Sequence, residues 1–275
     1  GLCRQQLDIC DIDSIRTAFD TYKPDVVINC AAYNRVDQAE LDIEKAMSVN
    51  ANGPKLIASE CHSRNICMVH ISTDFVFDGV LKRPYVEQDP AAPLSIYGKS
   101  KLEGERWVSD ILGFKAKVIR TSWLYSCRGH NFVKTMQGLF KVKDKLAVIA
   151  DQYGSPTWCE ALAVMILKLV KQTQKMGSKV NISRLTENSG AGVCNLYHYA
   201  GGASCSWFEL AGEIQRLTLS FSELESEPEQ EPESGLEVNI RSCKIEPIST
   251  LAWQALHKGC IAQRPHQSAL SAQKL

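Results

Sequence analysis

Short runs of apolar and β-branched residues alternate with longer amphipathic segments over the first two thirds of the 275-residue chain. This alternation is typical of successive strand and helix units that share a parallel sheet. The predicted fold class is therefore α/β, with a Rossmann-like doubly wound sheet. We expect helices at residues 14–22, 42–63 and 159–174, and strands at residues 25–30, 67–72, 116–120 and 146–150.

The pattern becomes less regular past residue 150, which indicates a smaller second lobe. We therefore expect a first domain at residues 1–150 and a C-terminal lobe at residues 151–275. Within that lobe, residues 222–234 contain six glutamates and hardly any apolar side chain. Such a segment cannot bury enough apolar surface to order itself, so we predict a disordered acidic loop there.

Charge and apolar content argue against several classes of partner. Lys plus Arg and Asp plus Glu number 31 each, so no overall field favours nucleic acid or an anionic membrane. The longest apolar stretch, residues 161–170, is far shorter than the roughly 20 residues that span a bilayer. The first residues show no basic and apolar leader, so a cytoplasmic location is expected.

Cysteine usage gives no sign of disulfides or of a metal site. The 11 cysteines are an odd number, and none stand in a Cys-x-x-Cys pair. No second ligand pair occurs at a recognisable zinc spacing. We therefore expect free, mostly buried thiols and no bound metal.

Three side chains in the sequence carry the groups that carbonyl reduction requires. Tyr97 and Lys101 open a predicted helix four residues apart, hence on one of its faces. A nearby ammonium lowers the tyrosine pKa, so that the hydroxyl can exchange a proton with a substrate oxygen. Such a pair also occurs by chance on solvated helices. Thr73, however, ends an apolar strand 24 residues earlier and could hold a hydroxyl beside Tyr97.

Longer motifs around these residues carry a specific resemblance. The first is Ser72-Thr73-Asp74-Phe75-Val76-Phe77-Asp78-Gly79, and the second is Tyr97-Gly98-Lys99-Ser100-Lys101-Leu102-Glu103-Gly104-Glu105. Further segments agree in order, at residues 29–40, 120–125, 131–136, 151–157, 196–199, 206–209 and 264–270. Over nearly its whole length the chain resembles the dTDP-4-dehydrorhamnose reductases, which are extended short-chain dehydrogenases.

The resemblance implies a set of roles. Thr73 would polarise the substrate ketone, Tyr97 would donate the proton, and Lys101 would also bond the nicotinamide ribose. The cofactor would be NADPH or NADH, bound by the first domain, and the second lobe would mainly bind the nucleotide-sugar substrate. Besides Tyr97 and Lys101, the cofactor would contact Asp8, Ile9, Ala31, Ala32 and Tyr33. The sugar site would be formed by Thr73 and Tyr97 together with Val36, Asp74 and Trp123.

Some of these assignments have ordinary structural alternatives. Small residues at Ala31 and Ala32 could reflect tight packing after a strand, and Trp123 could equally be a core aromatic. The family also begins with a strand and a glycine-rich turn that holds the cofactor pyrophosphate. This chain shows no such turn, and its first residues match the region after the second strand. We therefore expect an incomplete dinucleotide-binding domain.

Three functions remain in competition. The first is NAD(P)H-dependent reduction of the C4 ketone of dTDP-4-dehydro-L-rhamnose to dTDP-L-rhamnose, for surface polysaccharide. The second is another nucleotide-sugar reductase or epimerase; a dehydratase is disfavoured because Phe75 follows Asp74 where dehydratases usually have Glu. The third is a non-catalytic, NADP-binding regulatory subunit resembling that of methionine adenosyltransferase. The sequence is also compatible with assembly of the protein as a homodimer.

Overall fold

A four-stranded parallel sheet forms the centre of the first lobe. The computed structural model describes residues 1–177, 195–225, 243–259 and 261–274. The strands are β1 (Val26–Asn29), β2 (Cys67–Thr73), β3 (Ala116–Thr121) and β8 (Asn195–His198), in the order β1-β2-β3-β8. The predicted α/β class with a parallel sheet is confirmed.

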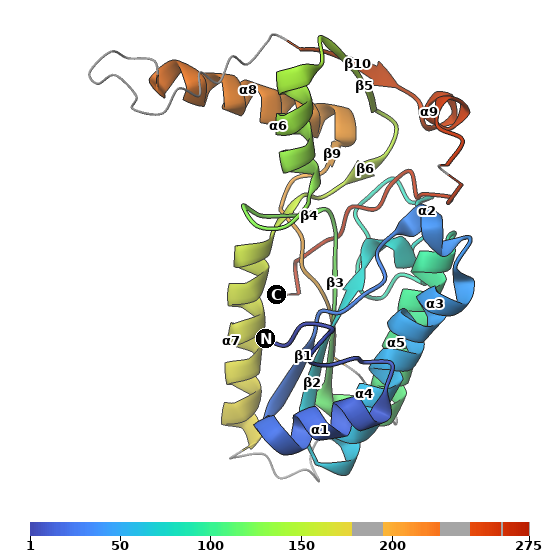
Figure 1. The fold of residues 1–275 in the computed structure, drawn as a ribbon, viewed down its shortest axis with the longest axis vertical. Helices are drawn as coiled ribbons and strands as arrows, with labels where there is room; N and C mark the ends of the chain where they lie inside the picture. The colour runs from blue at the N-terminus through green and yellow to red at the C-terminus, as the bar shows by residue number, and fades with distance from the viewer. Residues whose placement is uncertain (178–194, 226–242, 260, 275) are drawn as a thin grey trace.

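Helices cover both faces of this sheet (Figure 1). On one face lie α1 (Ile12–Tyr22), α4 (Gly53–Ser63) and α5 (Ile96–Leu112), which pack with Met68 and Val118. On the other face lies α7 (Cys159–Gly177), which packs with Val69 and Ile119. Adjacent residues of β2 thus point into two different cores, which explains why this strand is apolar almost throughout.

The predicted single helix at residues 42–63 consists of three consecutive pieces. They are α3 (Ile43–Met47), the π-helical turn η1 (Ser48–Asn52) and α4. Within η1 the fully buried Asn50 accepts a hydrogen bond from the backbone N–H of Tyr33 at 2.8 Å and donates one to the Ser100 hydroxyl at 3.0 Å. These bonds give a reason for the wide turn, because they hold the amide between two neighbouring segments.

The second lobe has its own small core. Strands β5 (Lys145–Ile149) and β10 (Lys244–Ile248) pair in parallel, and helices α6 (Phe132–Val142) and α8 (Trp207–Glu225) pack against each other and contribute to the same core. Helix α9 (Thr250–Leu256) follows β10 (Figure 1). Two short pairs complete the lobe, β4 (Leu124–Tyr125) with β7 (Thr157–Trp158) and β6 (Tyr153–Gly154) with β9 (Cys205–Ser206).

Three further short elements lie between the longer ones along the chain. They are α2 (Val36–Ala39) and the 3-10 turns η2 (Asp74–Val76) and η3 (Gly113–Lys115). The lobes do not divide cleanly at residue 150 as expected, because α7 and β8 return to the first sheet after β5 and β7. A single boundary therefore does not describe the path of the chain.

Two further expectations are modified by the structure. Helix α8 extends to Glu225, so the predicted acidic loop at residues 222–234 is helical at its start, and residues 226–234 lie outside the described residues. The described cysteines are free, but the expectation that most are buried is wrong, since of these only Cys61 and Cys243 are buried. Among the described residues no helix has the length and apolar character to cross a bilayer.

Candidate active site

Thr73 stands at the carboxyl end of β2, in the middle of the main sheet. Its side chain accepts a hydrogen bond from the backbone N–H of Phe75 at 3.2 Å and donates one to Asp74 Oδ1 at 3.0 Å. The first bond caps the short turn η2, which leads the chain away from the sheet. Thr73 pairs in register with Thr121 on β3, so polar residues of two neighbouring strands meet at this edge.

Tyr97 lies in the first turn of α5. The helix begins at Ser95, whose hydroxyl accepts a hydrogen bond from the Gly98 N–H at 3.1 Å. A Cβ at Gly98 would lie 2.2 Å from the carbonyl oxygen of Phe75, so glycine is required for the helix to approach η2. The Phe75 and Tyr97 rings meet edge to face, with centroids 5.6 Å apart. This close approach brings the Tyr97 hydroxyl to the hydroxyl of Thr73.

Lys101 follows one helical turn later and is only 2% exposed. Its ammonium donates a hydrogen bond to the carbonyl oxygen of Ile71 at 2.6 Å, two residues before Thr73. Burial lowers the pKa of Lys101 to about 8, opposed by the negative charge of Glu105 and by the Cys30 thiol. The side chain therefore remains mostly protonated at neutral pH.

The state of Tyr97 differs from the expectation drawn from the Tyr97 and Lys101 spacing. Burial raises the pKa of Tyr97 to about 12, opposed by a hydrogen bond with Thr73 and reinforced by the charge of Asp74. The predicted lowering by Lys101 is absent, because that ammonium is directed to the Ile71 carbonyl. The phenol consequently keeps its proton at neutral pH, which is the state of a proton donor.

The residues expected at the sugar site surround this edge from three elements. Asp74 is 2% exposed, and burial raises its pKa to about 6 despite hydrogen bonds from Ser268 and Thr73. Val36 begins α2, and Trp123 follows β3 two residues after Thr121. Trp123 has a left-handed backbone, with φ of 47°, and its ring stacks on Trp207 of the second lobe at 3.4 Å between centroids. It is thus packed as a bridge between the lobes.

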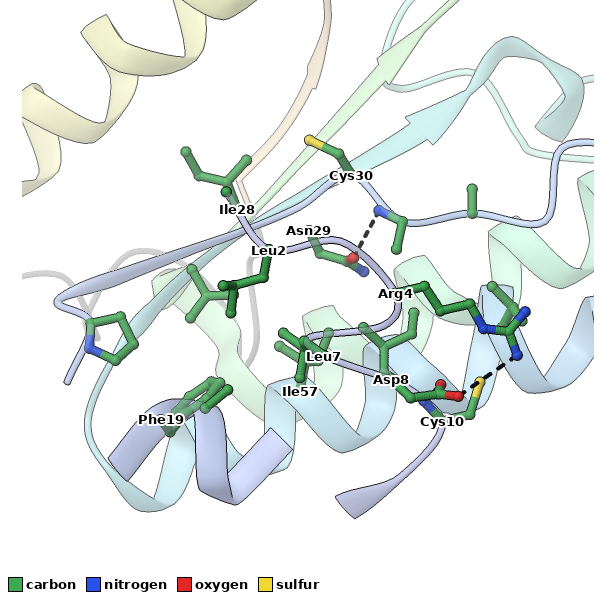
Figure 2. A pocket seen from close by; sticks show the side chains of 18 of the residues that line it. Leu2, Arg4, Leu7, Asp8, Cys10, Phe19, Ile28, Asn29, Cys30 and Ile57 are labelled. Carbon is green, nitrogen blue, oxygen red and sulfur yellow. Dashed lines mark hydrogen bonds and ion pairs between the residues drawn. The ribbon is translucent and has the colours of Figure 1, made fainter. Parts of the chain in front are cut away.

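Most of the expected cofactor residues line one cavity of about 890 Å³ beside β1. Figure 2 shows Asp8 at its rim, in an ion pair with Arg4, and the Asn29 side chain accepting a hydrogen bond from the backbone of Ala31. Five of the seven residues assigned to the cofactor line it, namely Asp8, Ile9, Ala31, Ala32 and Tyr33, whereas Tyr97 and Lys101 do not. The cavity is within the size range of ligand pockets, and its wall is mostly apolar.

A second, smaller cavity of about 320 Å³ lies within the second lobe. Its wall combines three aromatic side chains with aliphatic and polar ones. The lining includes Phe132, Trp207, Trp253, Gln152, Thr250 and Arg264. Arg264 also forms a two-point ion pair with Asp37 of α2, with closest atoms 2.5 Å apart, so this cavity is tied to the first lobe beside Val36.

Several residues that build the site could not be found from the sequence pattern. Asn50 fixes the loop after β1, Glu105 and Arg120 form a buried ion pair behind Lys101, and Arg264 links the lobes. Of these residues, only Glu105 could have been suggested by the sequence, because it stands four residues after Lys101 on the same helix. The others act through partners far away in sequence.

The chain matches a known protein family along its whole length. A family model described as the RmlD substrate binding domain matches residues 1–275. A dTDP-4-dehydrorhamnose reductase from Aggregatibacter actinomycetemcomitans is 38% identical over 223 residues, which cover 81% of this chain and 71% of that protein. The spore coat polysaccharide biosynthesis protein SpsK of Bacillus subtilis is 34% identical over 279 residues, covering 98% and 86%.

A solved structure agrees with these matches. The dTDP-4-dehydrorhamnose reductase of Bacillus anthracis in complex with NADP superimposes with a TM-score of 0.78 at 34% identity, covering all of this chain and 81% of that one. The chain belongs to the dTDP-4-dehydrorhamnose reductase family.

Membership of the dTDP-4-dehydrorhamnose reductase family decides between the classes of function that the sequence left open. The protein is an enzyme of a family of NAD(P)H-dependent nucleotide-sugar reductases that act on dTDP-linked 4-keto sugars. The non-catalytic regulatory subunit is therefore disfavoured. The relative from Bacillus anthracis was solved with NADP.

Proposed function

We propose that this enzyme reduces the C4 ketone of dTDP-4-dehydro-L-rhamnose to dTDP-L-rhamnose with NADPH or NADH. The observation that carries the proposal is the convergence of Thr73, Tyr97 and Lys101 at the carboxyl end of β2. It is supported by 31% to 38% identity to several dTDP-4-dehydrorhamnose reductases.

In this proposal the bound cofactor supplies the hydride, and the protein supplies the proton. The Tyr97 hydroxyl, which holds its proton because its pKa is raised, donates it to the ketone oxygen. The Thr73 hydroxyl, 3.0 Å from Asp74 Oδ1, turns towards the same oxygen and donates a hydrogen bond to it. The Lys101 ammonium, which bonds the Ile71 carbonyl and does not lower the Tyr97 pKa, would instead bond the nicotinamide ribose.

The cofactor would lie in the cavity beside β1, in contact with Asp8, Ile9, Ala31, Ala32 and Tyr33. The dTDP part of the substrate would extend into the aromatic cavity of the second lobe, since nucleobases stack on aromatic rings. The sugar would then lie between Asp74, Val36 and Trp123.

A direct assay tests the proposal. The purified protein is mixed with NADPH and dTDP-4-dehydro-L-rhamnose, and cofactor oxidation is followed by absorbance while the product is identified by NMR. We expect turnover with dTDP-L-rhamnose as the single product, so that the C4 alcohol forms in one configuration only. Absence of cofactor oxidation, with binding of both ligands shown by calorimetry, would contradict the assignment. Light scattering of the same sample tests the proposed homodimer.

A second dTDP-linked 4-keto sugar is the alternative substrate. A dTDP-4-keto-6-deoxy-D-glucose reductase of Streptomyces niveus is 35% identical over 79% of this chain and 69% of its own length, close to the values for the rhamnose enzymes. Parallel assays with dTDP-4-keto-6-deoxy-D-glucose and dTDP-4-dehydro-L-rhamnose decide between them. The ratio of the two kcat/KM values gives the preference.

A further inference from the structure

A buried ion pair lies directly behind the proposed catalytic side chains. The carboxylate of Glu105 on α5 receives three hydrogen bonds from Arg120 on β3, at 2.7, 3.0 and 3.2 Å. The Ser72 hydroxyl donates to the same carboxylate. The two charged side chains are only 7% and 5% exposed, so water screens them little.

The connections of this pair lead to the elements that hold the site. Ser72 immediately precedes Thr73 on β2, and Glu105 lies one helical turn after Lys101 and two turns after Tyr97 on α5. The Ser72 to Glu105 hydrogen bond therefore ties the end of β2 to the face of α5 that carries Tyr97 and Lys101. The bond from Lys101 to the Ile71 carbonyl runs between the same two elements.

Lys101 is a buried ammonium, and few groups near it can balance its charge. Glu105 faces it from its own helix, Cys30 from the segment after β1 and His70 from β2. His70 is neutral, because burial holds its pKa well below the usual range. Tyr97 lies at the start of α5, and Asp74 lies in the turn η2. Arg120 lies on β3 and is paired with Glu105. Glu105 is thus the strongest counter-charge to Lys101 among the described residues.

Arg120 in turn fixes where the Glu105 charge lies. Its guanidinium stacks over Phe77, 5.0 Å from the ring centre, and Glu105 is the carboxylate bonded to it in the described part of the chain. Because two donor groups of Arg120, Nε and Nη2, and the Ser72 hydroxyl occupy the carboxylate, Glu105 cannot swing to a direct contact with the ammonium. The charge remains at a set distance from Lys101.

We propose that Glu105, held by Arg120 and Ser72, is a positioning residue that keeps Lys101 in its charged form. This inference rests on the proposed function only in the use that the enzyme makes of Lys101. The state of the Lys101 side chain itself is measurable without any substrate.

Direct titration of Lys101 tests the inference. The protein is prepared with lysine labelled with carbon-13 at Cε, the Lys101 signal is assigned by its loss in Lys101→Arg, and its shift is followed against pH. In Glu105→Gln we expect the midpoint to fall by about one pH unit, a tenfold change in the proton affinity. The Glu105→Gln, Arg120→Met double variant removes both charges and avoids an unpaired buried guanidinium, and the same direction is expected there.

Glu103→Gln is the matched control. Glu103 lies on the same helix two residues earlier, but its side chain is 33% exposed and pairs with Arg106 at the surface. Its replacement should leave the Lys101 midpoint unchanged. In the active enzyme, the alkaline limb of the kcat/KM profile should move to lower pH with the Lys101 midpoint.

The outcomes separate the two proposals. An unchanged Lys101 midpoint in a folded Glu105 variant overturns the inference, whatever the activity. Failure of both Glu105 variants to fold, while Glu103→Gln folds, also overturns it, because the pair would then serve the fold and not Lys101. A shifted midpoint in a protein that reduces neither dTDP-linked keto sugar supports the inference and contradicts the proposed function.

Discussion

The first lobe holds the proposed reacting groups by hydrogen bonds at the end of a sheet covered on both faces, whereas the second lobe surrounds its cavity with aromatic rings beside a two-stranded sheet. Thr73 and Lys101 are nearly inaccessible, and each has defined partners. Trp207, by contrast, is held by stacking on Trp123 and by a tilted contact with Phe132. The difference teaches that changes in the first lobe should act on turnover, and changes in the second on substrate affinity.

The largest effect is expected from Tyr97→Phe, which removes the proposed proton donor and keeps the ring against Phe75. Turnover should fall by about two to four orders of magnitude, the usual contribution of a positioned acid. Steady-state kinetics with the dTDP-linked keto sugar measure it. Substrate KM and the circular dichroism spectrum should change little, and unchanged turnover would remove Tyr97 from the mechanism.

Asp74→Asn tests the buried carboxyl of the first lobe through its pH dependence. Because the folded-state pKa of Asp74 is raised from 3.8 to about 6, the wild-type protein loses stability as pH rises through this range. The asparagine variant lacks that loss. Its free energy of unfolding relative to wild type should therefore improve between pH 4 and pH 7, by on the order of 3 kcal/mol.

Urea unfolding of both proteins at several pH values checks this expectation. All other titrating groups are shared, so their contributions cancel in the difference between the two curves. A difference that stays constant from pH 4 to pH 7 would show that the Asp74 pKa is not raised in the folded protein.

Trp207→Ala examines the second lobe. The substitution removes a ring that lines the aromatic cavity and stacks on Trp123. We expect KM for the nucleotide sugar to rise about ten- to a hundredfold, with kcat within a few fold of wild type, since one aromatic contact contributes roughly 1 to 3 kcal/mol. Trp158→Ala is the control, because Trp158 is 53% exposed on β7. A fall in kcat without a rise in KM would contradict the proposal that the second lobe acts on substrate affinity and the first on turnover.

The smallest effect is expected at the contact between the lobes. Asp37→Asn weakens the ion pair with Arg264, whose two side chains are 28% and 21% exposed. Partial screening by water limits the loss of unfolding free energy to about 1 kcal/mol. Thermal unfolding measures it, with Glu213→Gln in the exposed pair with Arg216 as the control. A loss of several kcal/mol would mean that this pair is central to the joining of the lobes.

Local patterns predicted what depends on neighbours in the chain. The apolar run of β2 and the helical spacing of Tyr97 and Lys101 specified a buried strand and a shared helix face, and both are confirmed. The π-helical turn at Ser48–Asn52 could not be predicted, because it depends on Asn50 bonding Tyr33 and Ser100.

The protonation states of the site residues could not be predicted from the sequence either. Spacing alone placed an ammonium beside Tyr97, but burial dominates its pKa and the ammonium bonds the Ile71 carbonyl. Burial and the direction of a long side chain depend on segments 30 or more residues away in sequence. The same holds for the pairing of Arg120 with Glu105, since either residue alone reads as an ordinary charged position.

The repeated passage of the chain between the lobes limits how such a protein can be recombined. From β3 the chain enters the second lobe, returns with α7 and β8, and leaves again for α8 and β10. Its last described segment returns once more, where Leu270 bridges to Tyr85 and Lys274 donates a hydrogen bond to the Leu196 carbonyl. No single crossover point would exchange one lobe for that of a relative. With the sugar placed as proposed, a new sugar preference would need substitutions around Asp74, Val36 and Trp123, which lie on separate segments of the chain, and could not be inherited with one continuous module.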